Sequence, residues 1–432
     1  MTRTRLGILL THLSERTDLQ RFISELKSVN KEIIILIHSK DELIAKNLDV
    51  QYFILDLNDR RSFNIRPNFL LKFLKLKSKL RRERFNYMMR KTGANSRVVF
   101  FLKKSLRLIE AYLPGLISYD LYLKLLKNQN LPKIDRLLVF SIVNNHNVIS
   151  TYLSHNIPTD FYLYSWDHPI KEVAFSSRYN NIYVWNIGLK EDLVLFHDLI
   201  PEKIKVVGST QLTYIQSLLE KSLEFEKFPQ FIYIILTTGR SELILQELDF
   251  IENLARNINI SNPEIQIVVR KYPNAPEEML QTIAERITKC GAKFDEDFVG
   301  TYLKLDSSNE VKFLLLKSSK MIIHMGTTVG IEAILLNKNV VFYTFLENNF
   351  ESQKKLPKSL LIPNCIINQH HIQKYFISLG ENKIANSITD CINYLNKIDS
   401  TIRTNSFTHG IELLSNEQII EKMYNNECIS SL

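Results

Sequence analysis

The sequence predicts an α/β protein with two doubly wound domains, in each of which helices cover a parallel sheet. Near the N-terminus, two apolar strand patterns, Thr4–Leu10 and Glu32–His38, flank a segment of helical spacing at Leu19–Leu26. A strand, a turn, a helix and a second strand then follow one another between Lys320 and Tyr343. The 432 residues are enough for two domains, each with its own core.

The turn between Lys320 and Tyr343 is the first candidate binding site. It follows an apolar strand pattern and contains Gly326, Thr327 and Thr328, of which Thr328 is the expected N-cap of the helix. Ligands of open parallel sheets bind beyond the carboxyl ends of the strands, where the N–H groups of a helix start attract phosphate. Glu332 lies one position beyond the place for a capping box, so we expect it either to accept bonds from two ribose hydroxyls or only to favour the helix dipole.

Two other predicted strands end in groups that suit a phosphate. The strand pattern Phe231–Leu236 is followed by Gly239 and Arg240, which stand at the start of a predicted helix. The next strand pattern is followed by Arg270 and Lys271. These four residues are predicted to bind the nucleotide phosphates together with the turn at Gly326.

The sequence His324-x-Gly-Thr-Thr-x-Gly-x-Glu-Ala333, followed by Asn339-Val-Val-Phe-Tyr343, resembles the donor-binding segment of GT-B glycosyltransferases. It is most similar to bacterial surface-polysaccharide enzymes, including the capsule-synthesis and CDP-glycerol transferase relatives. The similarity continues upstream in Val184-Trp-Asn186 and in Pro201–Ser209. The resemblance implies the GT-B fold, a turn that cradles the phosphates, and a glutamate, Glu332, that holds the ribose.

The chain also departs from the related families. Tyr272 stands where they carry a histidine between a basic residue and a proline. Nucleotide-sugar 2-epimerases share the fold and a related turn, but their Ser-Gly-Gly-x-x-Glu-Glu sequence does not occur here, and an epimerase needs carboxylates from both domains facing the sugar. The resemblance therefore implies transfer of a sugar, or of a polyol phosphate, to a surface glycan. Helix N-termini and Arg or Lys would stabilise the departing phosphate, so no metal is required.

Asp167 and His168 are the first candidates for a catalytic base. They follow a strand pattern at Asp160–Tyr164, and a strand end is a favourable place for an acid or a base. The neighbouring tryptophan can raise the pKa of Asp167 by desolvation, whereas Pro169 is expected to turn the ring of His168 out of the crevice, so Asp167 is the stronger candidate. The alternative is a turn in which Asp167 accepts backbone bonds and Pro169 begins a helix. His12, after the first strand, is the next candidate, with a helix cap as its alternative.

A basic segment, Arg66–Arg107, contains fourteen Lys or Arg residues and one acid, although the whole chain carries a net charge of +9. Basic and apolar residues alternate within Asn68–Lys91, which is typical of an amphipathic helix on an anionic membrane surface. A solvated helix face and an RNA site are the alternatives, but no RNA-binding motif accompanies the charge.

The remaining composition argues against several classes of protein. The spacing of Cys290, Cys365, Cys391 and Cys428 indicates neither a zinc site nor a disulfide framework. Phe294-Asp-Glu-Asp-Phe298 mimics an Asp-x-Asp metal motif but is expected to be a solvated loop, so neither a metal nor a cofactor is predicted. No apolar stretch approaches the ~20 residues of a membrane span. Outside the basic segment the chain is slightly acidic, so no nucleic-acid partner is predicted. A cytoplasmic protein, peripheral on the inner face of the membrane, is expected.

Together these observations predict three parts. Residues 1–226 form an acceptor-side Rossmann-like domain, residues 227–400 a nucleotide-sugar-binding Rossmann-like domain, and residues 401–432 a C-terminal helix that packs back on the first domain. The predicted function is a metal-independent glycosyltransferase that uses a nucleotide sugar as donor substrate and a glycan or lipid-linked glycan as acceptor. A nucleotide-sugar 2-epimerase of the same fold and a non-catalytic glycan- or RNA-binding module remain the alternatives.

Overall fold

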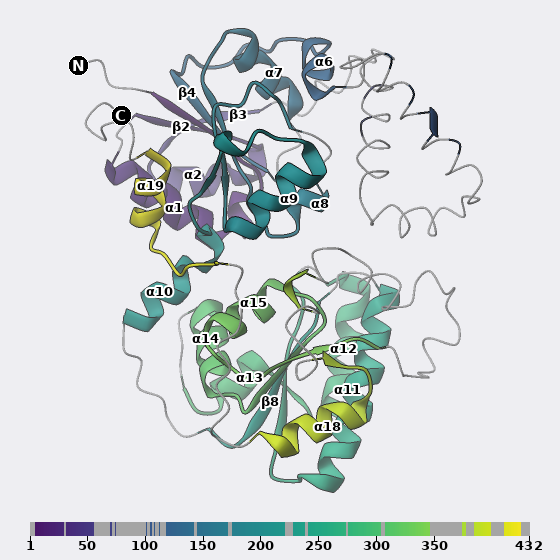
Figure 1. Ribbon diagram of the computed structural model, residues 1–432. Coiled ribbons are helices and arrows are strands. Elements are labelled where there is room, and N and C mark those ends of the chain that lie inside the picture. Colours follow the sequence, from purple (N-terminus) through teal and green to yellow (C-terminus); the bar gives the residue numbers. More distant parts are fainter. Residues whose placement is uncertain are drawn as a thin grey trace. The chain divides into compact units, whose positions relative to one another are not determined.

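The computed structural model divides the chain into two compact units (Figure 1). The first unit contains the described residues before 86, from 94 to 216 and from 409 onward, and the second those between 217 and 408. The residues that the structure describes are 5–29, 32–55, 70, 74, 101, 104, 105, 108, 112, 118–141, 145–171, 175–220, 228–237, 241–273, 275–303, 307–345, 374–376, 384–398 and 410–424.

The first unit is built around a parallel sheet of seven strands in the order β3-β2-β1-β4-β5-β6-β7. Most residues of these strands are apolar and buried, because helices cover both faces of a parallel sheet. The strands therefore appear in the sequence as near-continuous apolar runs. The strand order reverses between β1 and β4, and a ligand crevice is expected beyond their carboxyl ends. The strands are β1 (Leu6–Leu9), β2 (Ile33–Ile37), β3 (Gln51–Ile54), β4 (Arg136–Phe140), β5 (Thr159–Tyr162), β6 (Ile182–Val184) and β7 (Ile204–Val206).

Helices pack against this sheet, and the last of them comes from the C-terminal end of the chain. Helix α19 lies beside α1 (Figure 1), where Asn416 donates to Glu25 at 3.2 Å. The hydroxyl of Tyr183 donates to the carbonyl of Met423 at 3.0 Å and so ties α19 to β6. The helices are α1 (Thr17–Val29), α2 (Glu42–Asn47), α6 (Tyr119–Lys124), α7 (His146–Ser154), α8 (His168–Lys171), α9 (Ile187–His197), α10 (Thr213–Glu220) and α19 (Asn416–Tyr424), with 3-10 turns η1 (Leu13–Glu15), η2 (Ser39–Asp41), η4 (Pro201–Lys203) and η5 (Thr210–Leu212).

A buried ion pair joins β4 to β5. Nε of Arg136 lies 2.7 Å from Oδ2 of Asp160, and both side chains are buried. The other carboxylate oxygen of Asp160 accepts two bonds from Asn181, at 2.8 and 3.1 Å. The guanidinium of Arg136 also lies over the ring of Tyr424, 5.4 Å from its centroid, so Arg136 links the sheet to α19.

The second unit contains a six-stranded parallel sheet in the order β10-β9-β8-β11-β12-β13. Its strand order reverses between β8 and β11, which places the expected crevice at the end of β11. The strands are β8 (Phe231–Ile235), β9 (Gln266–Arg270), β10 (Lys293–Phe294), β11 (Met321–His324), β12 (Val340–Tyr343) and β13 (Ile384–Ala385).

Helices cover both faces of this second sheet (Figure 1). Met321 and Ile323 pack into an apolar core with α11, α12 and α18, so the alternate residues Ile322 and His324 face the other layer, which holds α13, α14 and α15. The helices are α11 (Ser241–Ser261), α12 (Glu277–Lys289), α13 (Asp295–Gly300), α14 (Ser308–Ser318), α15 (Thr328–Leu335) and α18 (Ile388–Lys397). The two parallel sheets with their helices confirm the predicted α/β class of two doubly wound units.

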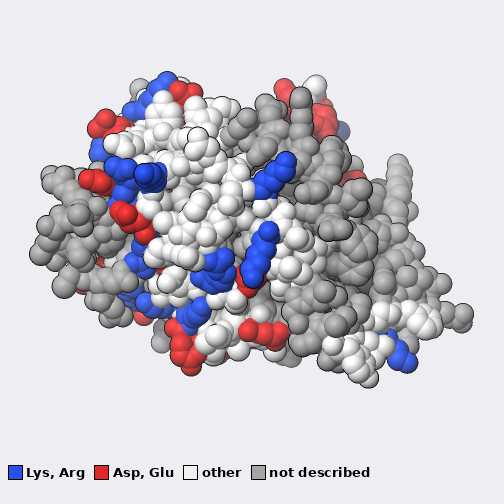
Figure 2. Space-filling model, turned by 90° about the horizontal axis from the view of Figure 1, so that it is seen from above, with Lys and Arg blue, Asp and Glu red and all other residues white. Residues whose placement is uncertain are grey.

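The predicted membrane-binding segment, Arg66–Arg107, lies almost wholly outside the described residues, so membrane binding stays a prediction. On the face of the molecule that Figure 2 shows, described basic side chains lie interspersed with acidic ones. Within the described ranges, none of the helices combines the length and the apolar character that crossing a membrane requires.

Candidate functional site

The turn after β11 is shaped by a glycine and capped by a threonine. Gly326 has a φ of +104°, a backbone conformation that favours glycine. The hydroxyl of Thr327 accepts from the N–H of Gly330 at 3.3 Å, so Thr327 is the N-cap of α15. The prediction that Thr328 is the N-cap was wrong by one position, because Thr328 is the first helical residue. Both threonines are half-buried at the start of the helix, where a phosphate is favoured.

His324 supports this turn from the end of β11. Its ring is fully buried, and Nδ1 accepts from the N–H of Gly326 at 3.1 Å. Burial lowers the pKa of His324 to about 3, so the ring is neutral at physiological pH. The ring centroid of Phe376 lies 4.4 Å away. His324 therefore cannot supply a positive charge to a phosphate, and its contact with nucleotide remains a prediction.

Gly330 lies so close to His324 that a larger residue would displace the ring. A Cβ at Gly330 would lie 2.3–2.7 Å from three ring atoms. We expect Gly330→Ala to lower the free energy of unfolding of the second unit by about 1–3 kcal/mol, the usual cost of overpacking a core.

Circular dichroism in a urea titration would measure this loss. Both tryptophans, Trp166 and Trp185, belong to the first unit, so a fluorescence transition should not move. Gly300→Ala is the matched control, since nothing lies within 4 Å of its Cβ position. An unchanged second-unit transition in Gly330→Ala would contradict the described packing.

Glu332, the predicted ribose ligand, is buried in α15 and paired with a lysine of the preceding helix. Nζ of Lys312, on α14, lies 3.0 Å from Oε1 of Glu332. Glu332 is 3% exposed and is the fifth residue of α15, so it lies beyond the first turn, where a glutamate favours the helix dipole most. Lys312 had no signal in the sequence, since its partner stands twenty positions away.

Arg270 is engaged within the second unit. Its Nη1 lies 2.5 Å from Oδ2 of Asp295, which also accepts from the hydroxyl of Tyr233 at 3.0 Å. Nη2 of Arg270 donates to Ser308 at 2.8 Å, at the start of α14. Asp295 therefore balances the charge of Arg270, whereas Lys271 is exposed beside it. Phosphate binding by these two residues stays a prediction.

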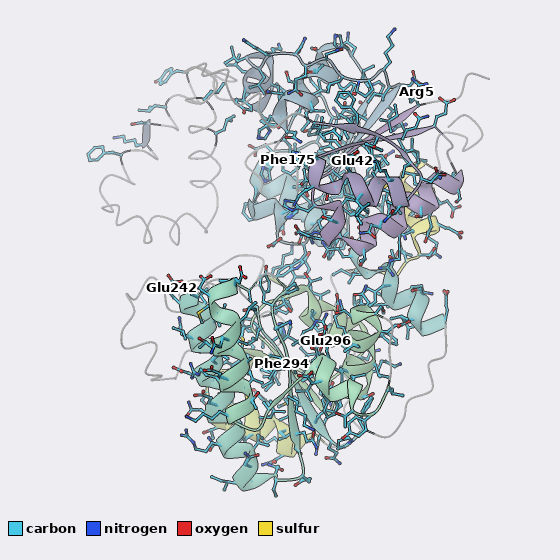
Figure 3. The ribbon with its side chains drawn as sticks, turned by 180° about the vertical axis from the view of Figure 1, so that it is seen from behind. Arg5, Glu42, Phe175, Glu242, Phe294 and Glu296 are labelled. Atoms are coloured by element: carbon cyan, nitrogen blue, oxygen red, sulfur yellow. The ribbon has the colours of Figure 1, made fainter. Side chains whose placement is uncertain are left out.

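The acidic segment Phe294–Phe298 leads into helix α13 and is not a loop, and of its three acids Asp295 is buried whereas Glu296 and Asp297 are exposed. Asp295 begins α13 and is buried, because Arg270 and the hydroxyl of Tyr233 satisfy its carboxylate. Phe294 and Glu296, its sequence neighbours, are labelled in Figure 3. Among the described residues, the structure contains no cluster of three or more His, Cys, Asp or Glu side chains suited to a metal ion.

The turn after β8 is anchored by a buried glutamate that the sequence did not reveal. Oε1 of Glu247, on α11, accepts from the N–H of Thr237 at 3.0 Å and also contacts the Thr237 hydroxyl. Burial raises the pKa of Glu247 to about 8, against the opposing effect of these bonds, so the carboxyl is largely protonated at pH 7. Gly239 and Arg240, predicted to bind phosphate in the same turn, lie outside the described residues.

In the first unit, Asp167 and His168 lie beyond the carboxyl end of β5. The Asp167 side chain is 14% exposed, and its Oδ1 lies 4.0 Å from Nε2 of His168. Nδ1 of His168 contacts Oγ of Ser141, which accepts from the N–H of Tyr164 at 2.8 Å. The expectation that Pro169 turns the His168 ring outward was wrong, because α8 begins at His168 and the ring is buried against Ser141.

His12 lies after β1, in a left-handed conformation with φ of 61°. Nζ of Lys40 lies 2.7 Å from its Nδ1, and Oε1 of Glu15 lies 3.3 Å from the same atom. Hydrogen bonds from His12 and Lys40 lower the pKa of Glu15. His12 stands at the N-cap position of η1, as the helix-cap alternative has it, but its side chain makes no cap hydrogen bond.

Besides Asp167, the first unit contains a further carboxyl, Asp18, that the sequence analysis did not predict as a site residue. Burial raises its pKa, although bonds from the Tyr164 hydroxyl, at 3.0 and 3.1 Å, act in the opposite direction. Thr210 also donates to it at 3.3 Å, and Arg16 donates to the Tyr164 hydroxyl at 3.2 Å. This network joins the start of α1 to the segments that follow β5 and β7.

Comparison with known proteins identifies solved structures whose fold is similar to that of this chain. No protein-family model and no curated protein matches the chain. Among solved structures, the S. aureus MnaA-UDP co-structure is similar to it with a TM-score of 0.51 and 10% identity, over 99% of this chain and 98% of that one. A UDP-GlcNAc 2-epimerase from Neisseria meningitidis bound to UDP-GlcNAc gives a TM-score of 0.50 and 12% identity, over 98% and 100%. A candidate UDP-N-acetylglucosamine 2-epimerase from Listeria monocytogenes gives a TM-score of 0.50 and 11% identity, over 99% of this chain and 97% of that one.

These likenesses establish a GT-B-like fold of two Rossmann-like units. They also correct the predicted activity, because the structures from Neisseria meningitidis and Listeria monocytogenes are described as 2-epimerases and not as transferases. The prediction of a glycosyltransferase acting on a surface glycan was therefore wrong, and the alternative of a nucleotide-sugar 2-epimerase is better supported.

Proposed function

We propose that the chain is an enzyme that binds a UDP-sugar and inverts the configuration at carbon 2 of its sugar. The observation that supports this most is the fold likeness to a UDP-GlcNAc 2-epimerase, which extends over 98% of this chain and all of that one. The turn at Gly326 stands at the strand-order reversal of the second sheet, where such folds bind their ligands.

The second unit would bind the nucleotide. The N–H groups at the start of α15 and the hydroxyls of Thr327 and Thr328 suit a diphosphate. Since His324 is neutral, positive charge would come from the helix start and from Lys271. Glu332 would accept bonds from the ribose hydroxyls. The turn differs from the Ser-Gly-Gly-x-x-Glu-Glu of the known epimerases but keeps a glycine and a glutamate.

Inversion at carbon 2 constrains the chemistry. The proton on this carbon is weakly acidic, so its removal is coupled to breakage of the neighbouring C1–O bond. The C–H electron pair then forms a C1=C2 double bond, and UDP leaves with the C–O pair. Return of UDP to C1 and of a proton to the opposite face of C2 completes an inversion without net oxidation. Asp167 would take the first proton, and backbone N–H groups would stabilise the departing phosphate.

Proton NMR in D₂O would test the proposal directly. Incubation with UDP-GlcNAc should produce a second UDP-linked sugar, with deuterium replacing the proton on carbon 2 in product and recovered substrate. Parallel incubations with UDP-glucose and UDP-galactose would define the substituent that the enzyme requires. Binding of UDP without isomer or exchange for any of these sugars would refute the epimerase activity.

The ribose contact predicts a loss of affinity in one variant. Glu332→Ala should weaken UDP binding by about 1.5–3 kcal/mol, because hydrogen bonds to a charged acceptor contribute that much. Isothermal titration calorimetry would measure it. Glu278→Ala removes an exposed first-turn glutamate of α12 and should leave the affinity unchanged. A folded Glu332→Ala protein with the parent affinity would exclude the ribose role.

A further inference from the structure

The pair Lys312–Glu332 is placed where it can control the ligand turn. Lys312 is the fifth residue of α14 and Glu332 the fifth residue of α15. Helix α14 precedes β11 and α15 follows it, so both helices begin at the edge of the sheet where the strand ends. Each side chain therefore lies about one helical turn below the edge that carries Gly326.

Packing alone gives no reason for a lysine at this position. Lys312 is 9% exposed, although its helix neighbours Val311, Phe313 and Leu314 are apolar and buried. Removing an ammonium and a carboxylate from water costs several kcal/mol each, and well-packed apolar residues often give equal or higher stability. A buried ion pair is thus weak evidence for a role in stability, and a role in positioning accounts for it better.

We infer that Lys312 is a positioning residue that sets Glu332 for recognition of a vicinal diol, the ribose 2′- and 3′-hydroxyls of the nucleotide. This inference rests on the proposed function. The 3.0 Å contact to Oε1 holds one carboxylate oxygen in place and so restricts the rotation of the group. An ionised carboxylate is an acceptor only, so a carboxylate of fixed orientation receives hydroxyl donors in one geometry. Without Lys312, this restraint on Oε1 is lost.

A pair of ligands that differ in one hydroxyl tests this inference. UDP and 2′-deoxy-UDP share base and diphosphate, so the ratio of their affinities isolates the ribose contact. The parent protein should bind UDP about tenfold tighter, the effect of one charge-assisted hydrogen bond. Lys312→Met should reduce that ratio to about twofold, while Lys312→Arg, which keeps the cation, should preserve most of it.

Two further variants separate positioning from folding. Lys317→Met, the same change later in α14, should leave the ratio at its parent value. If Lys312→Met does not fold, Lys312→Met combined with Glu332→Gln removes both charges and should fold, with the same low ratio.

The outcomes distinguish this inference from the proposed function. A tenfold ratio that persists in folded Lys312→Met overturns the positioning role alone. A tenfold ratio that persists in the double variant, which lacks the Glu332 carboxylate, overturns the ribose contact of Glu332 and the positioning role with it. A parent protein that binds UDP without preferring it over 2′-deoxy-UDP also overturns this role. A parent protein that binds neither nucleotide overturns the proposed function and this inference with it.

Discussion

Replacing Arg136 by Met is expected to lower the free energy of unfolding of the first unit by about 3–5 kcal/mol. The change leaves Asp160 as a fully buried carboxylate whose strongest partner is gone, because Nε of Arg136 lies 2.7 Å from it. The two bonds from Asn181 remain but cannot balance the charge. The methylenes of Met still fill much of the volume, so the loss reports the unpaired charge more than a cavity.

Tryptophan fluorescence during a urea titration measures this change in the first unit alone, since Trp166 and Trp185 both belong to it. Lys46→Met is the control, because Lys46 forms an exposed pair with Glu42, which is labelled in Figure 3. Its midpoint should equal that of the parent protein. A shift in Arg136→Met no larger than in this control would show that the pair contributes nothing to stability.

The fold could be predicted because its strands are buried on both faces. Residues such as Ile33–Ile37 and Met321–Ile323 form apolar runs that need no distant partner to be recognised. The turn at Gly326 was found for a similar reason, since a glycine and two hydroxyls between a strand and a helix form a local pattern.

The polar partners inside each unit could not be predicted, because they come from distant positions. Lys312 appears in the sequence as one lysine of an ordinary helix, and only the fold brings it to Glu332. Asp295 belongs to an acidic run that is typical of solvent-exposed segments. Its burial is possible because Arg270, at the end of β9, forms an ion pair with it. Glu247 shows the same limit, because a glutamate that anchors a turn ten residues earlier has no sequence signature.

The reaction was harder to predict than the fold for a chemical reason. A turn that binds a nucleoside diphosphate serves a transferase and an epimerase equally well, because both reactions release the same leaving group. What separates them is the group that takes a proton or activates an acceptor. We expect such residues in the first unit, where Asp167 and His12 follow strands and Asp18 lies at the start of α1, all three in surroundings that suit a proton transfer.

Among these candidates, Asp167 carries the strongest prediction for catalysis. Asp167→Asn should lower kcat for formation of the isomer at least ~10²-fold, within the usual contribution of a general base. Asparagine keeps the shape of the side chain but cannot accept the proton, while the affinity for UDP, whose proposed site is in the second unit, should hardly change. The carboxyl lies at the end of β5 and is largely shielded from water, which suits a proton transfer.

His168→Asn should cost less, because Nδ1 of His168 is already engaged by Ser141 and its ring supports the position of Asp167 from 4.0 Å. Asp198→Asn is the matched control, since this exposed residue at the end of α9 has a φ of 52° that asparagine adopts readily. Deuterium exchange at carbon 2 provides a second readout, because a lost base abolishes exchange together with isomer formation. An active Asp167→Asn enzyme, or a larger loss in His168→Asn, would move the base elsewhere, with His12 and Glu15 the next residues to replace.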